Sequence, residues 1–235
     1  MTECNSNISE VLSNLDRIND LSIDINDHHY IVLSYLFLWM KTNALNVAKG
    51  VMLDYGCGGQ PYKALFSSKV SNYISADIVA AKGVELDIVI EPNRKLPLDD
   101  GSIDTVLSTQ ALEHANDADF YLGECSRLLK SGGNLILTAP MQWRHHEVPY
   151  DYHRFTRYGL IEYLGRHNLS IKEISPCGGV YALLGQIFLN HLNERGVRKK
   201  FIYRFANRLF LWLDRKFYDA EDTLNWLCIA EKKIY

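Results

Sequence analysis

Short apolar runs rich in β-branched residues alternate with longer amphipathic segments along most of this chain, and this order constrains the fold more than any other feature. The runs expected to be strands are residues 51–54, 73–77, 87–90, 103–108, 135–138, 171–175 and 224–230. Between the fourth and fifth runs, residues 117–130 form an amphipathic segment that Asn116 or Asp117 can cap and Gly132-Gly133 can end. Strand–helix–strand order of this kind predicts a mostly parallel α/β sheet with helices on both faces.

The chain is expected to form one α/β domain with two helical additions. Its 235 residues, of which 47% are hydrophobic, suit a single domain with its own core. Residues 1–48 are predicted to form an N-terminal helical cap, residues 49–235 the α/β domain, and residues 180–220, approximately, a helical insertion before the last strand. The apolar run 30–40 is too short to span a bilayer and is interpreted as a buried helix.

Charge and cysteine content exclude several classes of protein. A net charge of -3 gives no general attraction to nucleic acid, so no nucleic-acid partner is expected. The N-terminus lacks the basic and then apolar layout of a signal peptide. The cysteines are odd in number and scattered, with no CxxC pair; they are Cys4, Cys57, Cys125, Cys177 and Cys228. This pattern disfavours disulfides and structural zinc and favours the reducing cytoplasm.

A glycine loop follows the first expected strand. It reads Asp-x-Gly-x-Gly-Gly from Asp54, and Gly56 and Gly58 allow a sharp turn and a close approach of backbone to a ligand. A dinucleotide-binding GxGxxG loop needs glycine where this chain has Pro61, which argues against a nicotinamide oxidoreductase. The loop also lacks the lysine and hydroxyl of a phosphate-binding loop. Alone, it is equally consistent with a tight strand-to-helix turn.

Asp77 ends the second expected strand, about twenty residues after the glycine loop. A carboxylate at this place can accept hydrogen bonds from both ribose hydroxyls of an adenosine ligand. The alternative is a helix cap or a turn aspartate. The order of the two features favours a nucleoside site.

Four segments together resemble successive motifs of the class I S-adenosylmethionine-dependent methyltransferases. They are LDYGCGGQPY, YISADI, LPLDDGSIDTVLSTQALEHA and LLKSGGNLILTAP, which lie between about Val51 and Pro140. The branch with a GCGxxPY loop is the most similar one. The resemblance implies a Rossmann-like sheet of seven strands, methyltransferase activity and S-adenosyl-L-methionine as the cofactor.

The resemblance also assigns roles to individual residues. It implies that Asp54 holds the glycine loop or the methionine amino group, that Gly56 and Gly58 line the methionine moiety, and that Asp77 binds the ribose. Thr109 or Gln110 is then expected beside the sulfonium.

The adenine contact has two candidates. The family places an acidic residue a few positions before Leu-Pro, which matches Glu91 with one extra residue in the spacing, and Asp87 is the second candidate. Pro92 lacks the N–H that often meets adenine after the acidic residue.

Histidines gather in and before the segment that follows the fifth expected strand, residues 140–156. A hydroxyl acceptor benefits from a general base near neutral pKa, so His146, His145 and His114 are the candidate catalytic residues, with His146 preferred. The alternatives are a polar loop residue at each position, and capping or packing for His114. Histidine and glutamate also cluster here, but adjacent histidines lack the i, i+4 spacing of a helical zinc site, and no metal is expected.

The same segment suggests the class of acceptor. Rings of Trp143, Tyr150, Tyr152 and Phe155 can stack on a sugar or an aromatic group, and Arg144 and Arg154 can pair with a phosphate or carboxylate. The pattern HE-x-P-x-D-x-x-RFT-x-x-GL of residues 146–160 resembles a branch found among glycan-assembly enzymes. That resemblance implies O-methylation of a sugar, glycolipid or similar small molecule. Residues 108–111 lack the Asn/Asp-Pro-Pro-aromatic motif of nucleic-acid base methyltransferases.

Residues 195–216 are basic, and Phe201, Phe205, Leu209 and Trp212 form one apolar stripe among the cations. One interpretation is a helix that packs on the sheet or on a second subunit of a homodimer. The other is peripheral contact with the inner face of an anionic membrane, which suits a lipid-linked acceptor. A different class of function also stays open: a catalytically silent module that binds S-adenosylmethionine or S-adenosylhomocysteine as a partner subunit.

Overall fold

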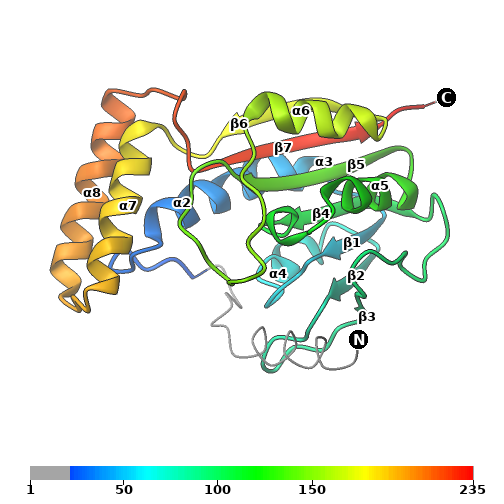
Figure 1. Ribbon diagram of the computed structural model, residues 1–235, viewed down its shortest axis with the longest axis horizontal. Coiled ribbons are helices and arrows are strands. Elements are labelled where there is room, and N and C mark those ends of the chain that lie inside the picture. The colour runs from blue at the N-terminus through cyan, green and yellow to red at the C-terminus, as the bar shows by residue number, and fades with distance from the viewer. Residues whose placement is uncertain (1–21, 235) are drawn as a thin grey trace.

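The computed structural model describes residues 22–234, which fold around one seven-stranded sheet (Figure 1). The strands are β1 (Val51–Tyr55), β2 (Asn72–Asp77), β3 (Ile88–Val89), β4 (Ile103–Thr109), β5 (Leu129–Pro140), β6 (Leu169–Pro176) and β7 (Asn225–Lys232). Their order is β3-β2-β1-β4-β5-β7-β6. Strands β1 to β5 pair in parallel, and β7 runs antiparallel to both of its neighbours. The predicted strands and the mostly parallel Rossmann-like sheet are confirmed.

Helices connect the strands. They are α2 (Tyr30–Trp39), a π-helical turn η1 (Met40–Ala44), α3 (Leu45–Val47), α4 (Lys63–Phe66), a 3₁₀ turn η2 (Leu112–His114), α5 (Ala118–Leu128), α6 (Arg157–Arg166), α7 (Val180–Glu194) and α8 (Lys200–Lys216). The helical cap expected over residues 1–48 is described only from residue 22, where it comprises α2, η1 and α3. The residues before that lie outside the described part.

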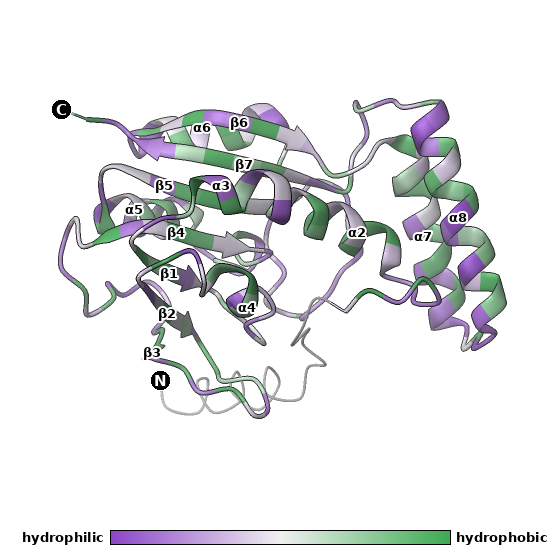
Figure 2. Ribbon diagram, turned by 180° about the vertical axis from the view of Figure 1, so that it is seen from behind, coloured by the Kyte–Doolittle hydropathy of each residue, from purple (hydrophilic) through white to green (hydrophobic). Residues whose placement is uncertain are grey.

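The central strands bury side chains on both faces. Met52, Leu107 and Ile136 belong to the cluster beneath α2, α4 and α7, whereas their strand neighbours Leu53 and Val106 pack with α5 and α6. Successive side chains of a strand point to opposite faces, so apolar residues at consecutive positions require cover on both. The apolar residues on both faces of the strands therefore explain why helices cover the sheet on both sides. The result is three layers, with the sheet in the middle (Figure 2).

Helix α5 begins as expected and ends earlier than expected. Asp117 accepts a hydrogen bond from the Phe120 backbone N–H at 2.8 Å and caps the helix. The helix ends at Leu128, so Gly132 is not its stop: β5 already begins at Leu129. Gly132 has φ +73°, and the register between β4 and β5 shifts beside it. The glycine therefore serves an irregularity within β5.

The helical pair α7–α8 stands at the end of the sheet toward which the parallel strands point (Figure 1). The Asp214 carboxylate on α8 accepts hydrogen bonds from the Gly179 and Ala182 backbone N–H groups at 3.1 and 3.0 Å, and from the Tyr35 hydroxyl at 2.6 Å. This buried carboxylate thus caps the start of α7 and ties α8 to α2. Packing of the apolar stripe on the sheet is not what the structure shows: α8 packs on α7 through Tyr203 and its neighbours, and the stripe faces outward. In the described part of the chain, no helix is long and apolar enough to cross a membrane.

Candidate active site

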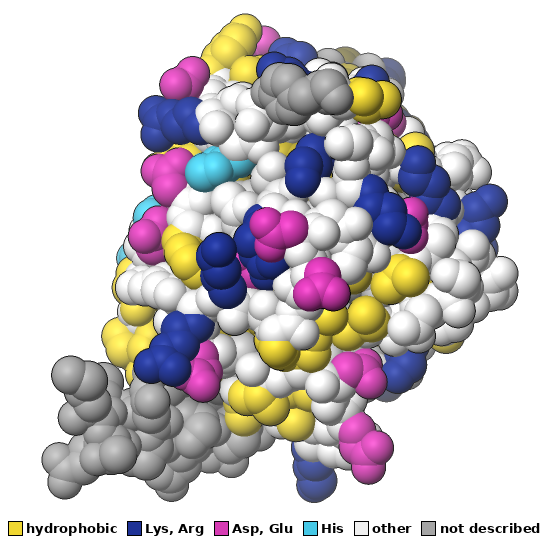
Figure 3. All heavy atoms as spheres, turned by 90° about the vertical axis from the view of Figure 1, so that its right-hand side faces the viewer, with side chains coloured by type: hydrophobic (Ala, Val, Ile, Leu, Met, Phe, Trp, Pro, Cys, Tyr) yellow, Lys and Arg dark blue, Asp and Glu magenta, His cyan; other side chains and the backbone are white. Residues whose placement is uncertain are grey.

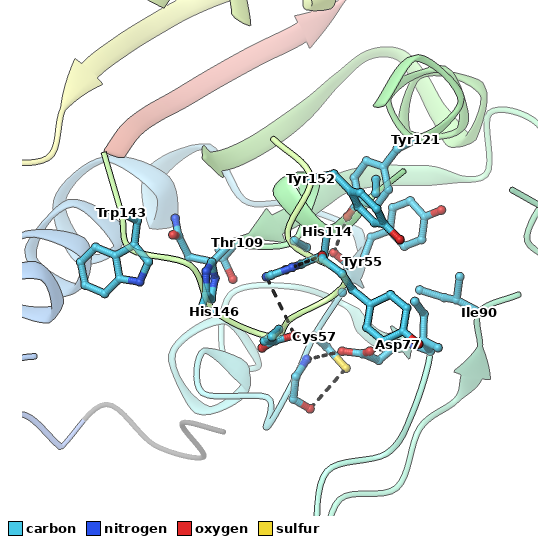
Figure 4. A pocket seen from close by; sticks show the side chains of 18 of the residues that line it. Tyr55, Cys57, Asp77, Ile90, Thr109, His114, Tyr121, Trp143, His146 and Tyr152 are labelled. Carbon is cyan, nitrogen blue, oxygen red and sulfur yellow. Dashed lines mark hydrogen bonds and ion pairs between the residues drawn. The ribbon is translucent and has the colours of Figure 1, made fainter. Parts of the chain in front are cut away.

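A cavity of about 670 Å³ opens at the carboxyl ends of β1, β2 and β4. Its walls come from the glycine loop, from the segments after β2 and β4, from α2, and from the loop after β5. Asp77 and Ile90 lie at one side, Trp143 lies at the other, and His114 and His146 lie between them (Figure 4). This is the place where parallel α/β sheets bind ligands.

The glycine loop and Asp77 form one unit at this cavity. Gly58 donates its backbone N–H to Asp77 Oδ2 at 2.7 Å, and Gly56 donates to the Ala76 carbonyl at 2.8 Å. Gly56 has φ +79°, and a Cβ on it would lie 2.4 Å from the Ala111 Cβ. Only glycine therefore fits, and bare backbone faces the cavity as an adenosyl ligand requires. Asp77 is 7% exposed, lines the cavity, and also accepts a hydrogen bond from the Ile78 backbone N–H at 2.7 Å.

Thr109 and Gln110 also line the cavity, at the end of β4. The Gln110 side-chain amide donates to Thr138 Oγ1 at 2.9 Å, and its φ is +50°. The Tyr121 hydroxyl donates to the Tyr55 carbonyl at 2.8 Å, while the two rings stack 4.3 Å apart. These contacts fix the part of the wall that lies beside the glycine loop.

Two of the residues expected to bind the cofactor lie elsewhere. Asp54 is 1% exposed and is not among the residues that line the cavity; the Tyr73 hydroxyl donates to it from β2, and burial raises its pKa to about 7. Strand alternation explains this, because Tyr55, not Asp54, points to the cavity side. Glu91 is exposed, pairs with Arg94 at 2.7 Å, and does not line the cavity.

Asp87, the second candidate for the adenine contact, already has hydrogen-bond partners within the protein. The Asp87 carboxylate accepts hydrogen bonds from the Ser75 backbone N–H and hydroxyl at 2.8 and 2.7 Å. The residues that line the cavity here are Ile90, Pro92 and Asn93. At this part of the wall Asn93, and not Glu91, is therefore the polar side chain that borders the cavity.

His114 and His146 both line the cavity and contact each other edge to face, with ring centroids 4.7 Å apart. His114 Nδ1 lies 2.7 Å from the Tyr150 carbonyl, which can only accept, so Nδ1 carries the proton and Nε2 the lone pair. His146 Nδ1 lies 3.5 Å from an Asp151 carboxylate oxygen and has no hydrogen-bond partner. Burial and the neighbouring His114 lower the pKa of His146, which favours its neutral form.

Asp151 holds this loop in place. Its carboxylate accepts hydrogen bonds from Arg154 Nη1 and Nη2 at 2.6 and 2.8 Å and from the His146 backbone N–H at 3.2 Å. Although burial acts to raise the pKa of Asp151, these hydrogen bonds hold it well below its usual value. Both terminal nitrogens of Arg154 thus bind Asp151. Arg154 is therefore not the contact for a phosphate or carboxylate of the acceptor that the sequence suggests.

Glu113 is a residue of this site that sequence reasoning missed. It is fully buried, and neither of its carboxylate oxygens has a hydrogen-bond partner. Its Oε1 lies 3.9 Å from His146 Nε2, and burial raises its pKa to about 8. In the sequence, its position directly before His114 was the signal that could have identified it as a residue of the site.

The remaining predicted residues divide between the cavity and other places. His145 is 90% exposed at its side chain and does not line the cavity, and Phe155 is buried in the core beside α6. Trp143, Tyr150 and Tyr152 do line the cavity. Arg144 lines it as well and pairs with Glu194 of α7; the same wall includes His29, which the sequence did not indicate.

The comparisons with known proteins agree with this geometry. Residues 53–137 match the family described as "Methyltransferase domain". The sarcosine/dimethylglycine N-methyltransferase of Halorhodospira halochloris is 30% identical over 130 residues, which cover 54% of this chain and 43% of that protein. The ubiquinone biosynthesis O-methyltransferase of Chelativorans sp. (strain BNC1) is 32% identical over 99 residues, covering 37% of this chain and 39% of that protein. The alignments thus span less than half of either relative.

Solved structures share the fold over nearly the whole chain. A geranyl diphosphate methyltransferase in complex with GPP and sinefungin superposes with a TM-score of 0.60 at 12% identity, covering 97% of this chain and 99% of that one. A putative sarcosine dimethylglycine methyltransferase from Galdieria sulphuraria gives 0.57 at 14% identity, covering 98% of each. The fold is that of class I methyltransferases, and the domain match supports an S-adenosylmethionine-dependent methyltransferase.

Proposed function

We propose that this protein transfers a methyl group from S-adenosyl-L-methionine to a hydroxyl oxygen of a sugar, a glycolipid or a similar small molecule. The observation that carries the proposal is the continuity of the cavity, which joins the Gly58–Asp77 end to the His114–His146 end. A catalytically silent binding subunit needs only the first end. The presence of both favours an enzyme.

The residues at the first end suit an adenosylated amino acid. Asp77 accepts hydrogen bonds from the ribose, Gly56 and Gly58 leave room beside their backbone, and Thr109 and Gln110 border the passage to the histidines. The bound cofactor supplies a methyl group on a positively charged sulfur, which needs no further activation. The protein's task is to orient the acceptor and to exclude water from it.

The second end suits a hydroxyl acceptor. The Nε2 lone pairs of His114 and His146 can accept the hydrogen of a bound hydroxyl and so direct an oxygen lone pair toward the cofactor end. Flat rings of Trp143, Tyr150 and Tyr152 offer stacking surfaces for a sugar or an aromatic ring. Among the relatives, one is an O-methyltransferase by name and one an N-methyltransferase, and the pair of imidazole acceptors favours the former.

A lipid-linked acceptor is favoured by the outer face of α8. Phe201, Phe205, Leu209 and Trp212 are 70%, 67%, 37% and 51% exposed. Six cations accompany them on and beside α8, which are Lys199, Lys200, Arg204, Arg208, Arg215 and Lys216, whereas the acidic Asp214 is buried. Apolar rings flanked by cations match an anionic bilayer surface. The opposite end of the molecule instead mixes both signs of charge (Figure 3).

Two measurements test the proposed function. Calorimetric titration with S-adenosylhomocysteine should show saturable binding to the wild-type protein; its absence would overturn the cofactor assignment. A methyl-transfer screen over nucleotide sugars and glycolipids, read by release of S-adenosylhomocysteine, should find a turned-over hydroxyl compound. Binding without turnover of any hydroxyl acceptor, alongside turnover of an amine, would contradict the O-methylation proposal.

A further inference from the structure

We infer that Glu113, His114 and His146 form a binding site for a divalent first-row transition cation on the acceptor side of the cavity. The inference rests on the proposed function and changes how the acceptor hydroxyl is held: the cation, in place of the two Nε2 lone pairs, would bind the hydroxyl oxygen. One ligand atom from each residue lies within 4.8 Å of the others. Two imidazole nitrogens with one carboxylate, and a fourth position open to substrate, are the ligand set of catalytic zinc sites.

The orientation of the two imidazoles is the first support. His114 Nδ1 lies 2.7 Å from the Tyr150 carbonyl, and His146 Nδ1 has an Asp151 carboxylate oxygen 3.5 Å away, without a hydrogen bond to it. Metal-binding histidines almost always have such an outer partner, which fixes the tautomer and leaves Nε2 for the ion. The Nε2 atoms then face the carboxylates of the cluster: Glu113 for His146, and Glu147 for His114, each at 3.9 Å.

The buried carboxylate is the second, independent support. Both Glu113 oxygens are without a hydrogen-bond partner although the residue has no exposed surface. Burial of a carboxylate is unfavourable unless the group is paired, protonated or bound to a metal. An ion beside Glu113 and the two Nε2 atoms removes that penalty and explains why an acidic residue occupies this position.

The charges around the cluster point to a dication. Three carboxylates face the cluster, those of Glu113, Glu147 and Asp151, and the one cation among these neighbours is the Arg154 guanidinium. Carboxyl groups therefore outnumber cations around the cluster by three to one, a setting that favours a bound dication.

The geometry requires only a modest closure. Tetrahedral coordination at about 2.0–2.1 Å separates neighbouring ligand atoms by about 3.3 Å, compared with 3.9 Å between His146 Nε2 and Glu113 Oε1. All three ligand atoms lie within 4.8 Å of one another, so the cluster must contract on binding an ion. The absence of i, i+4 spacing, which disfavoured a metal in the sequence, is irrelevant here because the ligands come from η2 and from the loop after β5.

Cobalt(II) is the probe for this site. The protein is stripped with a chelator, checked for fold by circular dichroism, and titrated with Co²⁺ while its ligand-field absorption is recorded. The wild-type protein should bind one equivalent with the intense bands of a low-coordinate site, and Zn²⁺ should displace it. Glu113→Gln and His146→Asn should each weaken binding by at least about 100-fold, consistent with the loss of one of three ligands.

Two matched variants make the test specific. His145→Asn changes the adjacent, exposed histidine and should retain the site. His28→Asn removes a member of the other His-rich group among the described residues, Asp27-His28-His29, and should also retain it. No stoichiometric binding to the wild type, or binding lost in His28→Asn and kept in Glu113→Gln, would overturn the inference.

The outcome is separable from the proposed function. S-Adenosylhomocysteine binding is measured on the same stripped samples. If that ligand binds while Co²⁺ does not, the metal site is wrong and the methyltransferase proposal stands. Should Glu113→Gln fail to fold, Glu113→Asp provides the second variant, because it keeps the carboxylate and should bind Co²⁺ more weakly with an altered spectrum.

Discussion

The Gly58 backbone N–H lies 2.7 Å from the Asp77 carboxylate, so the glycine loop and the end of β2 are joined before any ligand binds. Replacing Asp77 with Ala removes the proposed ribose acceptor and this support together. Each hydrogen bond to a charged group contributes about 1.5–3 kcal/mol, so S-adenosylhomocysteine should bind about 10- to 100-fold more weakly. Calorimetry measures the change, and Asp99→Asn, an exposed turn residue, is the control. Unaltered affinity in Asp77→Ala would show that the ribose lies elsewhere.

Gly56→Ala should destabilise the fold more than a change in backbone preference alone explains. Its φ of +79° is nearly that of Gly83, +78°, but a Cβ at Gly56 meets Ala111 at 2.4 Å whereas one at Gly83 meets nothing within 4 Å. Gly83→Ala thus measures the cost of the backbone conformation, about 1 kcal/mol. Gly56→Ala should cost roughly 1–3 kcal/mol more, because it overpacks the loop.

Urea denaturation of both variants gives the difference directly. Equal losses of stability in the two variants would mean that the glycine loop relaxes around the added methyl group. The loop would then not need glycine at position 56 for reasons of space.

Asn93, and not Glu91, should influence binding of the adenine end. Asn93 lines the cavity, whereas Glu91 is exposed and paired with Arg94. Asn93→Ala should weaken S-adenosylhomocysteine about 3- to 10-fold, as the loss of one neutral hydrogen bond does. Glu91→Gln should leave the affinity within twofold. The reverse pattern would restore the assignment that the sequence suggested.

The contrast between these two residues shows what the sequence could predict. The strands, the glycine loop and Asp77 follow from local patterns: runs of β-branched residues, glycine spacing, and a carboxylate at a strand end. Glu91 was chosen from a family spacing that has one extra residue here, and no periodicity in a loop tells which of its side chains faces the cavity. Glu113 and His146 were both visible as residue types, yet their approach depends on how the loop after β5 folds back over η2.

Asp54 should make the stability of the protein depend on pH near neutrality. Its buried carboxyl has a folded pKa of about 7, above the unfolded value of 3.8, so the contribution of this group to stability is complete below about pH 4 and is lost as the pH rises through 7. Each pKa unit corresponds to about 1.4 kcal/mol, and the full loss is on the order of 4 kcal/mol.

Asp54→Asn tests this because the amide retains a partner for the Tyr73 hydroxyl without ionising. The variant should therefore gain stability relative to the wild type between pH 4 and pH 8, as read from parallel urea denaturation series. Parallel curves across this range would contradict a raised pKa. Since Asp54 does not line the cavity, the same variant should bind S-adenosylhomocysteine almost normally.

Binding of the protein to membranes should depend on the exposed apolar stripe of α8. Phe201→Ser/Phe205→Ser removes two outward rings that are 70% and 67% exposed, so the fold should be unaffected, whereas burial of each ring in a bilayer contributes about 1.5–3 kcal/mol. Co-sedimentation with vesicles rich in anionic lipid should therefore fall by at least tenfold in the double variant. Tyr158→Ser, which removes an exposed ring on α6, is the matched control and should bind like the wild type.

Neutral vesicles and high salt should both reduce wild-type binding, because the flanking cations supply part of the attraction. A wild-type protein that ignores acidic vesicles at low salt but dimerises through this face, as judged by light scattering of the double variant, would assign the stripe to a second copy of the chain.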